Sequence, residues 1–287
     1  MAMDSSINLR NDIIFKFVFG YEKNEKLLIS LLNAILGLKG DKKIVSLTFL
    51  NSFNIKEYLK DKLTILDVKV VDGTGIRYNV EMQVADDKSY LKRILYYLAK
   101  LYTEQLKEKE PYDKLCKVIS ISILDFNFFE DEADLLNIFR FLNIKSKKEL
   151  TDLKEIQFIE LPKFNKDKPK RDMSKFEKWL LALKFGEIYA SDFNSIPEEI
   201  KEEEDIMMAL QEMVRASNDE YIRELLEMRS KARHDEASRL YQAKEEGKEE
   251  ERMEIVKNML QEGLKLETIV KLTGMSIESI QEMQKKV

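Results

Sequence analysis

The sequence predicts an α/β fold in which a sheet flanked by helices is followed by a helical C-terminal region. Segments with helical spacing of apolar residues alternate with short β-branched segments up to about Phe129, the order of a sheet covered by helices. "KVISISILDFNFF" has the composition of a buried central strand. From Ile196 onward the pattern is helical and dense in Glu and Lys. We therefore expect one domain at residues 1-190 and a helical region at 196-287.

The elements of the first domain follow in order. "NEKLLISLLNAILGLKG" has apolar residues at helical spacing, and Gly37 stands where a C-terminal cap belongs. "KIVSLTFLNS" is a short strand candidate, and residues 65–85 form a candidate hairpin. "DDKSYLKRILYYLAKLYTEQLKEKE" is an amphipathic helix that we expect to end before Pro111.

Residues 130–190 have a weaker pattern. "DLLNIFRFLNI" and "EIQFIEL" are candidate strands, although the first could equally be a short helix, and "SKFEKWLLALKFGE" is helical. The loop "PKFNKDKPKR" between them is rich in lysine. A solvated loop is the favoured interpretation, and a phosphate-facing patch beside an active site is the alternative.

The C-terminal region reads as charged helices that begin near Pro197. Its last segment contains two short helices separated by "TGMS", with Ser276 as the cap of the second. This arrangement resembles a helix-turn-helix, but the second helix carries acids before its terminal lysines, which suits DNA poorly. We expect these helices to serve homo-oligomerisation, as a dimer, or regulation.

Composition excludes several classes of protein. The chain has 287 residues, 44% of them hydrophobic, and a net charge of −5, so it lacks the overall basic excess of many DNA-binding domains. This balance does not exclude DNA binding, because a local basic surface can lie beside acidic segments. Cys116 is the single cysteine, which allows no intrachain disulfide. No segment approaches the roughly 18 apolar residues of a membrane span, and "MAMDSSINLR" lacks the apolar core of a signal peptide. We expect a cytoplasmic protein without membrane contact.

The inventory of reactive side chains also narrows the chemistry. His234 is the single histidine and lies in a charged run, so a surface position is favoured over a catalytic triad. One Cys and one His exclude a zinc site of those ligands, and the glycine-rich phosphate loops are missing. Carboxylates, amides and lysines remain for catalysis. The oxygen atoms of the carboxylates and amides are the hard ligands that suit Mg²⁺.

The candidate hairpin "ILDVKVVDGTGIRYNVEMQVA" carries one acid on each strand, Asp67 and Glu81. A three-residue loop, Gly73–Gly75, would place Asp67 opposite Glu81, whereas a two-residue loop would put them on opposite faces. Glycines at both ends of the loop favour the first register. Opposed carboxylates about 4.5–5.5 Å apart at Cβ repel each other. A protonated carboxyl, a nearby Lys69 or a divalent cation would relieve this repulsion; an ordinary solvent-facing polar strand is the alternative.

Several blocks together carry a family resemblance. They are "NDIIFKFVFG", "LLNAILGL", "ILDVKVVD", "YNVEMQ", "RILYYLAKLYTEQL" and "VISISILDF", in this order. In this combination the chain resembles the recombination-promoting nuclease family, transposase-like proteins with a PD-(D/E)XK nuclease core. The resemblance implies a restriction-endonuclease-like mixed sheet flanked by helices, and metal-dependent cleavage of DNA. The density of matches falls after the last block.

The resemblance assigns roles to individual residues. Asp67 and Glu81 match the two metal-binding acids, and the backbone carbonyl of Met82 would be a further metal ligand. Gln83 stands where the superfamily has lysine, so Lys69 is a candidate for the missing positive charge. Asp12 matches an acid on the opening helix, although it could equally cap that helix. The other substrate-binding or structural candidates are Lys16, Arg93 and Tyr97.

Each of the helix candidates has a structural alternative. Arg93 could pair with an acid on its own helix. Tyr96, Tyr97 and Tyr102 more often pack with a hydrogen-bonded hydroxyl than stack on bases. The sequence therefore leaves open which of these side chains converge on one site.

The favoured function is a DNA endonuclease that depends on Mg²⁺, with Mn²⁺ or Ca²⁺ as alternatives, in recombination, mobile elements or defence. The second hypothesis is a catalytically weak or inactive nuclease-like module that binds DNA or protein, supported by Gln83. The third is a structural oligomer built on the Glu/Lys-rich helices. Metal-dependent cleavage distinguishes the first hypothesis from the other two.

Overall fold

A computed structural model of the chain describes residues 7–50, 68–85 and 87–284. In these residues the sheet has six strands in the order β1-β2-β3-β4-β6-β5. The strands are β1 (Leu47–Phe49), β2 (Val68–Asp72), β3 (Arg77–Gln83), β4 (Val118–Leu124), β5 (Leu136–Leu142) and β6 (Glu149–Glu160). β3, β4 and β6 run parallel, and the outer pairs are antiparallel. The sheet is therefore mixed, and its strand β4 is buried along its whole length.

The helices of the first unit are α1 (Asp12–Phe19), α2 (Glu25–Ile35), α4 (Tyr90–Thr103), α5 (Lys175–Ser191), α6 (Glu198–Lys201) and α7 (Glu204–Asn218). Asn11 caps α1 by accepting the N–H groups of Ile13 and Ile14. Ser174 and Glu177 form a capping box at the start of α5. Gly37 follows α2 with a φ of 62°, the left-handed conformation expected of a residue after a helix.

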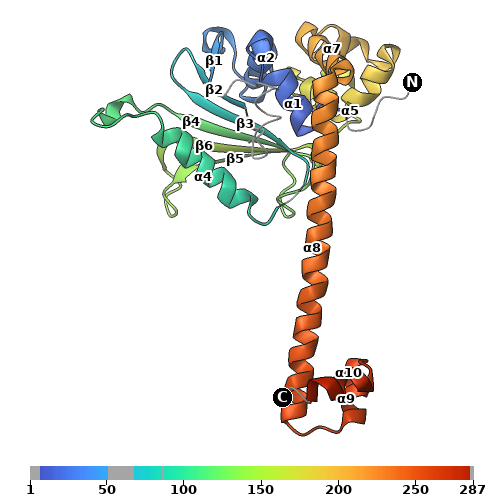
Figure 1. Cartoon of the computed structure of the whole chain (residues 1–287). Helices are drawn as coiled ribbons and strands as arrows, with labels where there is room; N and C mark the ends of the chain where they lie inside the picture. The colour runs from blue at the N-terminus through green and yellow to red at the C-terminus, as the bar shows by residue number, and fades with distance from the viewer. Residues whose placement is uncertain (1–6, 51–67, 86, 285–287) are drawn as a thin grey trace. The chain divides into compact units, whose positions relative to one another are not determined.

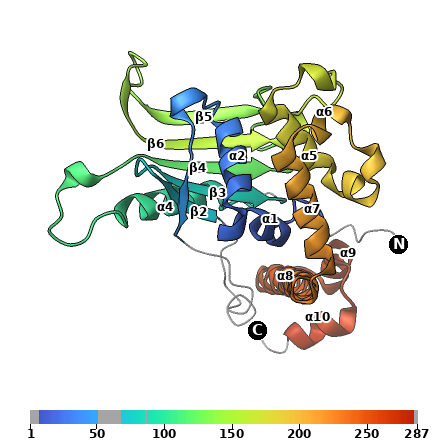
Figure 2. The ribbon, with the colours of Figure 1, turned by 90° about the horizontal axis from the view of Figure 1, so that it is seen from above.

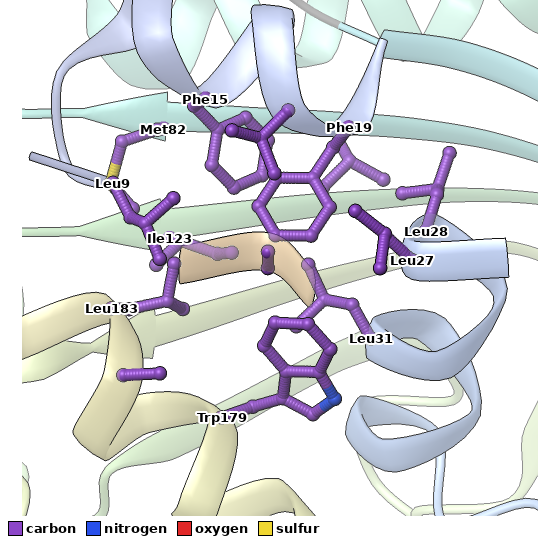
Figure 3. Close-up of a cluster of buried hydrophobic side chains, with 14 of the residues drawn as sticks. Leu9, Phe15, Phe19, Leu27, Leu28, Leu31, Met82, Ile123, Trp179 and Leu183 are labelled. Atoms are coloured by element: carbon purple, nitrogen blue, oxygen red, sulfur yellow. The ribbon is translucent and has the colours of Figure 1, made fainter. Parts of the chain in front are cut away.

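The helices cover the two faces of the sheet unequally. α1, α2, α5 and α7 pack on the face that carries Val80 and Met82, whereas α4 is the one helix of the described residues on the opposite face, against Val118 and Leu124 (Figures 1 and 2). The larger core includes Phe15 and Phe19 of α1 beside Trp179 of α5 (Figure 3). Alternation along a strand therefore sends even-numbered residues of β3 into this core and odd-numbered ones toward α4.

The helix before Pro111 is shorter than its sequence predicts. α4 ends at Thr103, whose hydroxyl donates to the carbonyls of Ala99 or Lys100. The side chain of Gln105 then bonds to both backbone groups of Cys116, at 2.9 and 3.0 Å. These contacts direct the chain toward β4 before the charged residues that follow could extend the helix.

The C-terminal boundary also differs from the expected one. Ile200, Leu210, Ile222 and other apolar residues beyond position 196 belong to the same hydrophobic core as the sheet. The first compact unit accordingly runs to Leu226, beyond the domain end at residue 190 that the sequence suggests. The reason is that α6, α7 and the first turns of α8 (Glu220–Gln261) bury apolar faces, despite their high content of Glu and Lys.

The second unit comprises residues 227–287. Val256 of α8, Ile269 of α9 (Leu266–Thr273) and Ile280 of α10 (Ile277–Gln284) form its small core. Ser276 accepts the N–H of Ser279 at 3.2 Å, as the sequence predicts for the cap of the last helix. None of the helices in the described ranges is long and apolar enough to cross a lipid bilayer.

Glu160, at the end of β6, is a buried carboxylate that ties the chain after β4 to the sheet. It is fully buried, accepts the N–H groups of Phe128 and Phe129 at 2.7 and 3.1 Å, and pairs with Lys163 at 2.7 Å. Glu160→Gln should lower the free energy of unfolding by about 1–3 kcal/mol, because the Lys163 charge loses its partner. Urea denaturation measures this, with the exposed Glu108→Gln as control. An unchanged midpoint would contradict the structural role of Glu160.

Candidate functional site

The face of the sheet under α4 carries a buried polar cluster. Asn79 and Glu81 of β3 are paired in register with Ser120 and Ser122 of β4. Asn79 is 2% exposed and Glu81 8%, and both serines are fully buried. A buried ionisable carboxylate among polar groups, in place of apolar side chains, is the arrangement that catalytic and binding sites use.

The turn between β2 and β3 determines which side chains face each other. Asp72 Oδ1 accepts the N–H groups of Thr74 and Ile76 at 2.8 and 3.1 Å, and its Oδ2 accepts the hydroxyl of Tyr78 at 2.8 Å. Gly75 has a φ of 90°, and a Cβ there would lie 2.8 Å from Cys116 Sγ, so glycine is required twice over. The Asp72 backbone N–H bonds to the Ile76 carbonyl at 3.0 Å, which closes the turn.

The register is the one that the three-residue loop predicts. Val71 pairs with Arg77, Lys69 with Asn79, and Val68 with Val80. Asp67 itself lies outside the described residues, so the structure tests neither its position nor its role. Lys69 shares the α4 face with Asn79 and Glu81, because directly paired residues point to the same side of a sheet.

The alternation of hydrogen bonds indicates where the Met82 carbonyl points. Arg77 N–H donates to the Lys117 carbonyl, and the Gln83 carbonyl accepts from Asp125 N–H. The odd-numbered residues of β3 therefore bond toward β4, and the even-numbered ones face the other side. The carbonyl of Met82 is thus directed to the β2 side of the strand, beyond Val68, the first described residue of β2.

Arg93 connects α4 to the end of β3. Its guanidinium donates to Gln83 Oε1 at 3.2 Å and pairs with Asp87 at 3.4 Å. Hydrogen bonds from Ser89 hold the pKa of Asp87 below its ordinary value, so Arg93 faces an ionised acid. The sequence offered pairing with an acid on its own helix as the alternative for Arg93. Arg93 does pair with an acid, but this acid, Asp87, precedes α4. A positive charge therefore lies beside Gln83, at the end of β3.

Tyr90 closes the cluster from the first turn of α4. It is fully buried, and its ring lies 5.1 Å from the Arg93 guanidinium carbon and edge-on to Phe128. Burial first, and then the neighbouring Glu81 carboxylate, raise the pKa of its hydroxyl, which also faces Ser122. Tyr90 is accordingly a neutral hydroxyl next to Glu81 at all ordinary pH values.

The sequence did not identify Tyr90, Asn79 or the two serines as site residues. The available signal was "VISISIL", in which serines recur at every second position of a strand that is otherwise entirely β-branched or leucine. Such a period of two marks one polar face on a buried strand.

The other α4 candidates face the same side of the sheet. Lys69 Nζ lies 5.5 Å from the ring centroid of Tyr97, and Lys154 Nζ lies 4.3 Å from that of Tyr102. Tyr96 is 63% exposed and contacts Tyr97 edge-on. Two of the three tyrosines thus pack against lysines, and the third presents its ring to solvent.

Asp12 and Lys16 lie on α1, which packs on the Val80 and Met82 face. Asn11 caps this helix, so the alternative role of Asp12 as the cap is wrong; Asp12 is the first helical residue and accepts the N–H of Ile13. The preceding Arg10 pairs with Asp125, whose N–H bonds to the Gln83 carbonyl, so the start of α1 lies near the carboxyl end of β3. Lys16 is 3% exposed, which restricts contact with a large substrate.

The donor groups of the cluster suit a hard divalent cation. Within the described residues, no group of three or more His, Cys, Asp or Glu side chains could hold a metal ion, and Glu81 is the one carboxylate among the described members of this cluster. Its neighbours offer oxygen atoms, and Asn79 Oδ1 and Ser120 Oγ are buried without a hydrogen-bond partner in the described part of the chain. Oxygen donors of this kind are what Mg²⁺ binds, so the residues present fit the ion in type.

Two other features lie away from this cluster. A cavity of about 910 Å³ is lined by α2, the following loop and the start of α5, and none of the candidate site residues lines it. The lysine-rich loop forms internal ion pairs: Lys163 contacts Glu160, and Lys168 contacts Glu177, each at 2.7 Å. These pairs favour a structural role for the loop over phosphate binding.

Substitution of Ser120 measures how much the polar cluster lowers the free energy of unfolding. Its buried hydroxyl has no partner in the described residues, so Ser120→Ala should leave the free energy of unfolding unchanged or raise it by up to about 1 kcal/mol. Ser30 is the matched control, because its hydroxyl bonds to Asp205 and accepts Trp179 Nε1–H at 3.2 Å. Ser30→Ala should destabilise by about 1 kcal/mol or more. Equal destabilisation by both substitutions in urea denaturation would show that Ser120 is satisfied.

Comparison with known proteins supports one family. A search of curated proteins and a search of solved structures found no match to this chain. A family model described as "PD-(D/E)XK nuclease family transposase" matches residues 9–243, which span α1, the whole sheet and the first half of α8. The resemblance of the sequence blocks is thereby confirmed, together with the restriction-endonuclease-like sheet flanked by helices. The chain belongs to the PD-(D/E)XK nuclease family transposases.

Proposed function

We propose that the protein is a metal-dependent endonuclease that hydrolyses phosphodiester bonds of DNA in recombination, mobile-element activity or defence. The family implies nuclease chemistry, DNA as the substrate and a divalent metal ion. The observation that carries the proposal is Glu81, a carboxylate buried beside Asn79, Ser120 and Ser122 on the face of the sheet under α4. A solvent-facing polar strand, the alternative reading of this hairpin, does not require such burial.

Mg²⁺ would be held by Glu81, by the carbonyl of Met82 and by Asp67, which precedes β2 in the sequence. When bound, such an ion acidifies a water molecule and stabilises negative charge on a phosphate oxygen. The direction of the Met82 carbonyl and the register of β2 with β3 support this set of ligands. Tyr90 and Ser122 border Glu81 and restrict the directions that its carboxylate can take.

Arg93 supplies the positive charge that Gln83 lacks. An amide can orient a water molecule or donate to a phosphate, but it carries no charge. The Arg93 guanidinium is fixed at 3.2 Å from Gln83 and at 3.4 Å from Asp87. Its fork of donors suits phosphate oxygens. We therefore assign to Arg93, rather than to Lys69, the role of the superfamily lysine.

Lys69 and Tyr97 are proposed as contacts to the DNA backbone and bases on the α4 side of the sheet. A lysine over a tyrosine ring combines a charge with a stacking surface. Asp12 is proposed to support the metal ligands from the start of α1. For Lys16 we favour the structural role, because its side chain is buried. The physiological site would be in the cytoplasm, where DNA is accessible.

Substitution of the two acids, Glu81 and Asp67, tests the proposed metal site. Glu81→Gln and Asp67→Asn should each reduce plasmid cleavage in Mg²⁺ by about 10²-fold or more, because a metal ligand is lost. Cleavage by the wild type should disappear in EDTA and return with excess Mg²⁺ or Mn²⁺.

Glu160→Gln is the control for these variants, because it also removes a buried carboxylate of the sheet but lies at the end of β6. It should retain cleavage at temperatures where it is folded. If the wild type binds DNA but does not cleave it with any of the metal ions tested, an inactive nuclease-like regulator explains the protein better.

The second prediction concerns Arg93. Arg93→Gln should lower kcat/KM by about 10²-fold, because the charge on the developing phosphorane loses its partner. Adding Gln83→Lys to this variant should recover at least about tenfold of the loss, because the charge returns at the adjacent position. Gln83→Lys alone should lower activity, since a lysine would face the Arg93 guanidinium.

Lys92→Gln, an exposed cation on the same helix, is the control. Failure of the exchanged pair to recover any activity would assign Arg93 a purely structural role.

A further inference from the structure

β5 is an outer strand of the sheet with an uncovered edge. It pairs with β6 on one side, and in the described residues no strand lies on the other. Glu160 N–H bonds to the Leu135 carbonyl, so the odd-numbered residues Asn137 and Phe139 bond toward β6. The backbone groups of Ile138 and Arg140 therefore point away from the sheet, where they can form a further ladder.

The side chains of this edge are unusually apolar. Ile138 is 48% exposed, Phe139 46%, Phe141 51% and Leu142 48%. The charge on the strand, Arg140, is already bound to Glu155 at 2.7 Å. Outer strands of soluble monomers are normally protected by a free lysine, a proline or a covering element. Among the residues that the structure describes, the register shift after Arg140 is the one such device, and it leaves the segment from Leu136 to Arg140 regular.

Oppositely charged segments flank the strand. Four exposed acids precede β5: Glu130, Asp131, Glu132 and Asp134. Three exposed lysines follow it: Lys145, Lys147 and Lys148. None of these seven side chains forms an ion pair with any residue in the described ranges. The strand therefore has a negative end, an apolar centre and a positive end, all accessible.

We propose that β5 pairs antiparallel with β5 of a second copy of this chain, so that the two sheets become continuous. An antiparallel arrangement brings the acidic segment of each copy beside the basic segment of the other. Glu130 and Lys148 are equally far from Phe139 in the sequence, as are Asp131 and Lys147, so the two-fold axis lies near Phe139. The two Phe139 rings then meet on the α4 side.

A second copy is the occupant because the surface is complementary to itself. Two-fold symmetry uses one patch twice, and it satisfies both charged ends of both copies at once. A parallel strand would place acids beside acids and lysines beside lysines. The interface is distinct from the C-terminal helices at 196-287 that the sequence suggests for dimerisation, and it does not depend on the proposed nuclease activity.

The test is a charge-reversal cycle on the full chain, measured by sedimentation equilibrium at low ionic strength. Lys147→Glu with Lys148→Glu should raise the dimer dissociation constant by about tenfold or more, because acids then face acids at both ends. Glu130→Lys with Asp131→Lys should do the same. The four substitutions combined should restore the dissociation constant to within about threefold of the wild type. All four positions are exposed, so folding is preserved.

Lys42→Glu with Lys43→Glu, two adjacent exposed lysines elsewhere in the first unit, is the matched control and should leave the dissociation constant unchanged. Hydrogen exchange identifies the interface independently: the amides of Ile138 and Arg140 should be protected in proportion to the dimer fraction. A monomeric wild type overturns the proposal. So does a dimer in which these two amides exchange freely, or a four-fold variant that fails to recover, since either result assigns the dimer to another surface such as the C-terminal helices.

Discussion

The tight turn at Gly73–Gly75 determines which residues of β2 and β3 face each other, and the candidate site depends on that register. Asp72 accepts two backbone N–H groups inside the turn and the Tyr78 hydroxyl beside it, while Gly75 adopts a φ of 90° against Cys116. A slip by one residue would move Lys69 and its neighbours to the opposite face of the sheet. Glu81 would keep Ser122 of β4 beside it but would no longer share its face with Lys69 of β2. The turn thus determines which side chains of β2 and β3 lie on the α4 face several residues away.

Burial on the two faces of β3 has opposite chemical character. Val80 and Met82 fill the large core under α1 and α2, whereas Asn79 and Glu81 face α4 together with Ser120 and Ser122. The large core provides the stability that allows the other face to hold polar atoms without hydrogen-bond partners in the described residues. α4 contributes two side chains to this face: Tyr90 lies next to Glu81, and Arg93 donates a hydrogen bond to Gln83. We therefore propose that Arg93, which contacts Gln83, takes the role of the lysine that the family resemblance places at position 83.

Much of the fold could be predicted from the sequence because its signals are local. The hairpin register follows from loop length and glycine positions, and β4 follows from an uninterrupted β-branched run. The family assignment rests on blocks that the matched family model also spans. Other features required the structure, because they depend on contacts between distant segments. The end of α4 depends on Gln105 reaching Cys116, and α7 joins the sheet core despite its charged composition. Neither contact leaves a periodic pattern in the sequence.

We propose that Glu81 is a metal ligand in a site shared with Asp67 and the Met82 carbonyl. A crystal grown with Mn²⁺ and measured at the manganese absorption edge tests it most directly, because the anomalous signal locates the ion without reference to activity. We expect a single strong peak at bonding distance from the Glu81 carboxylate and the Met82 carbonyl oxygen, and we expect this peak to be absent in Glu81→Gln. An ion bound elsewhere, or the same peak in Glu81→Gln, would contradict it.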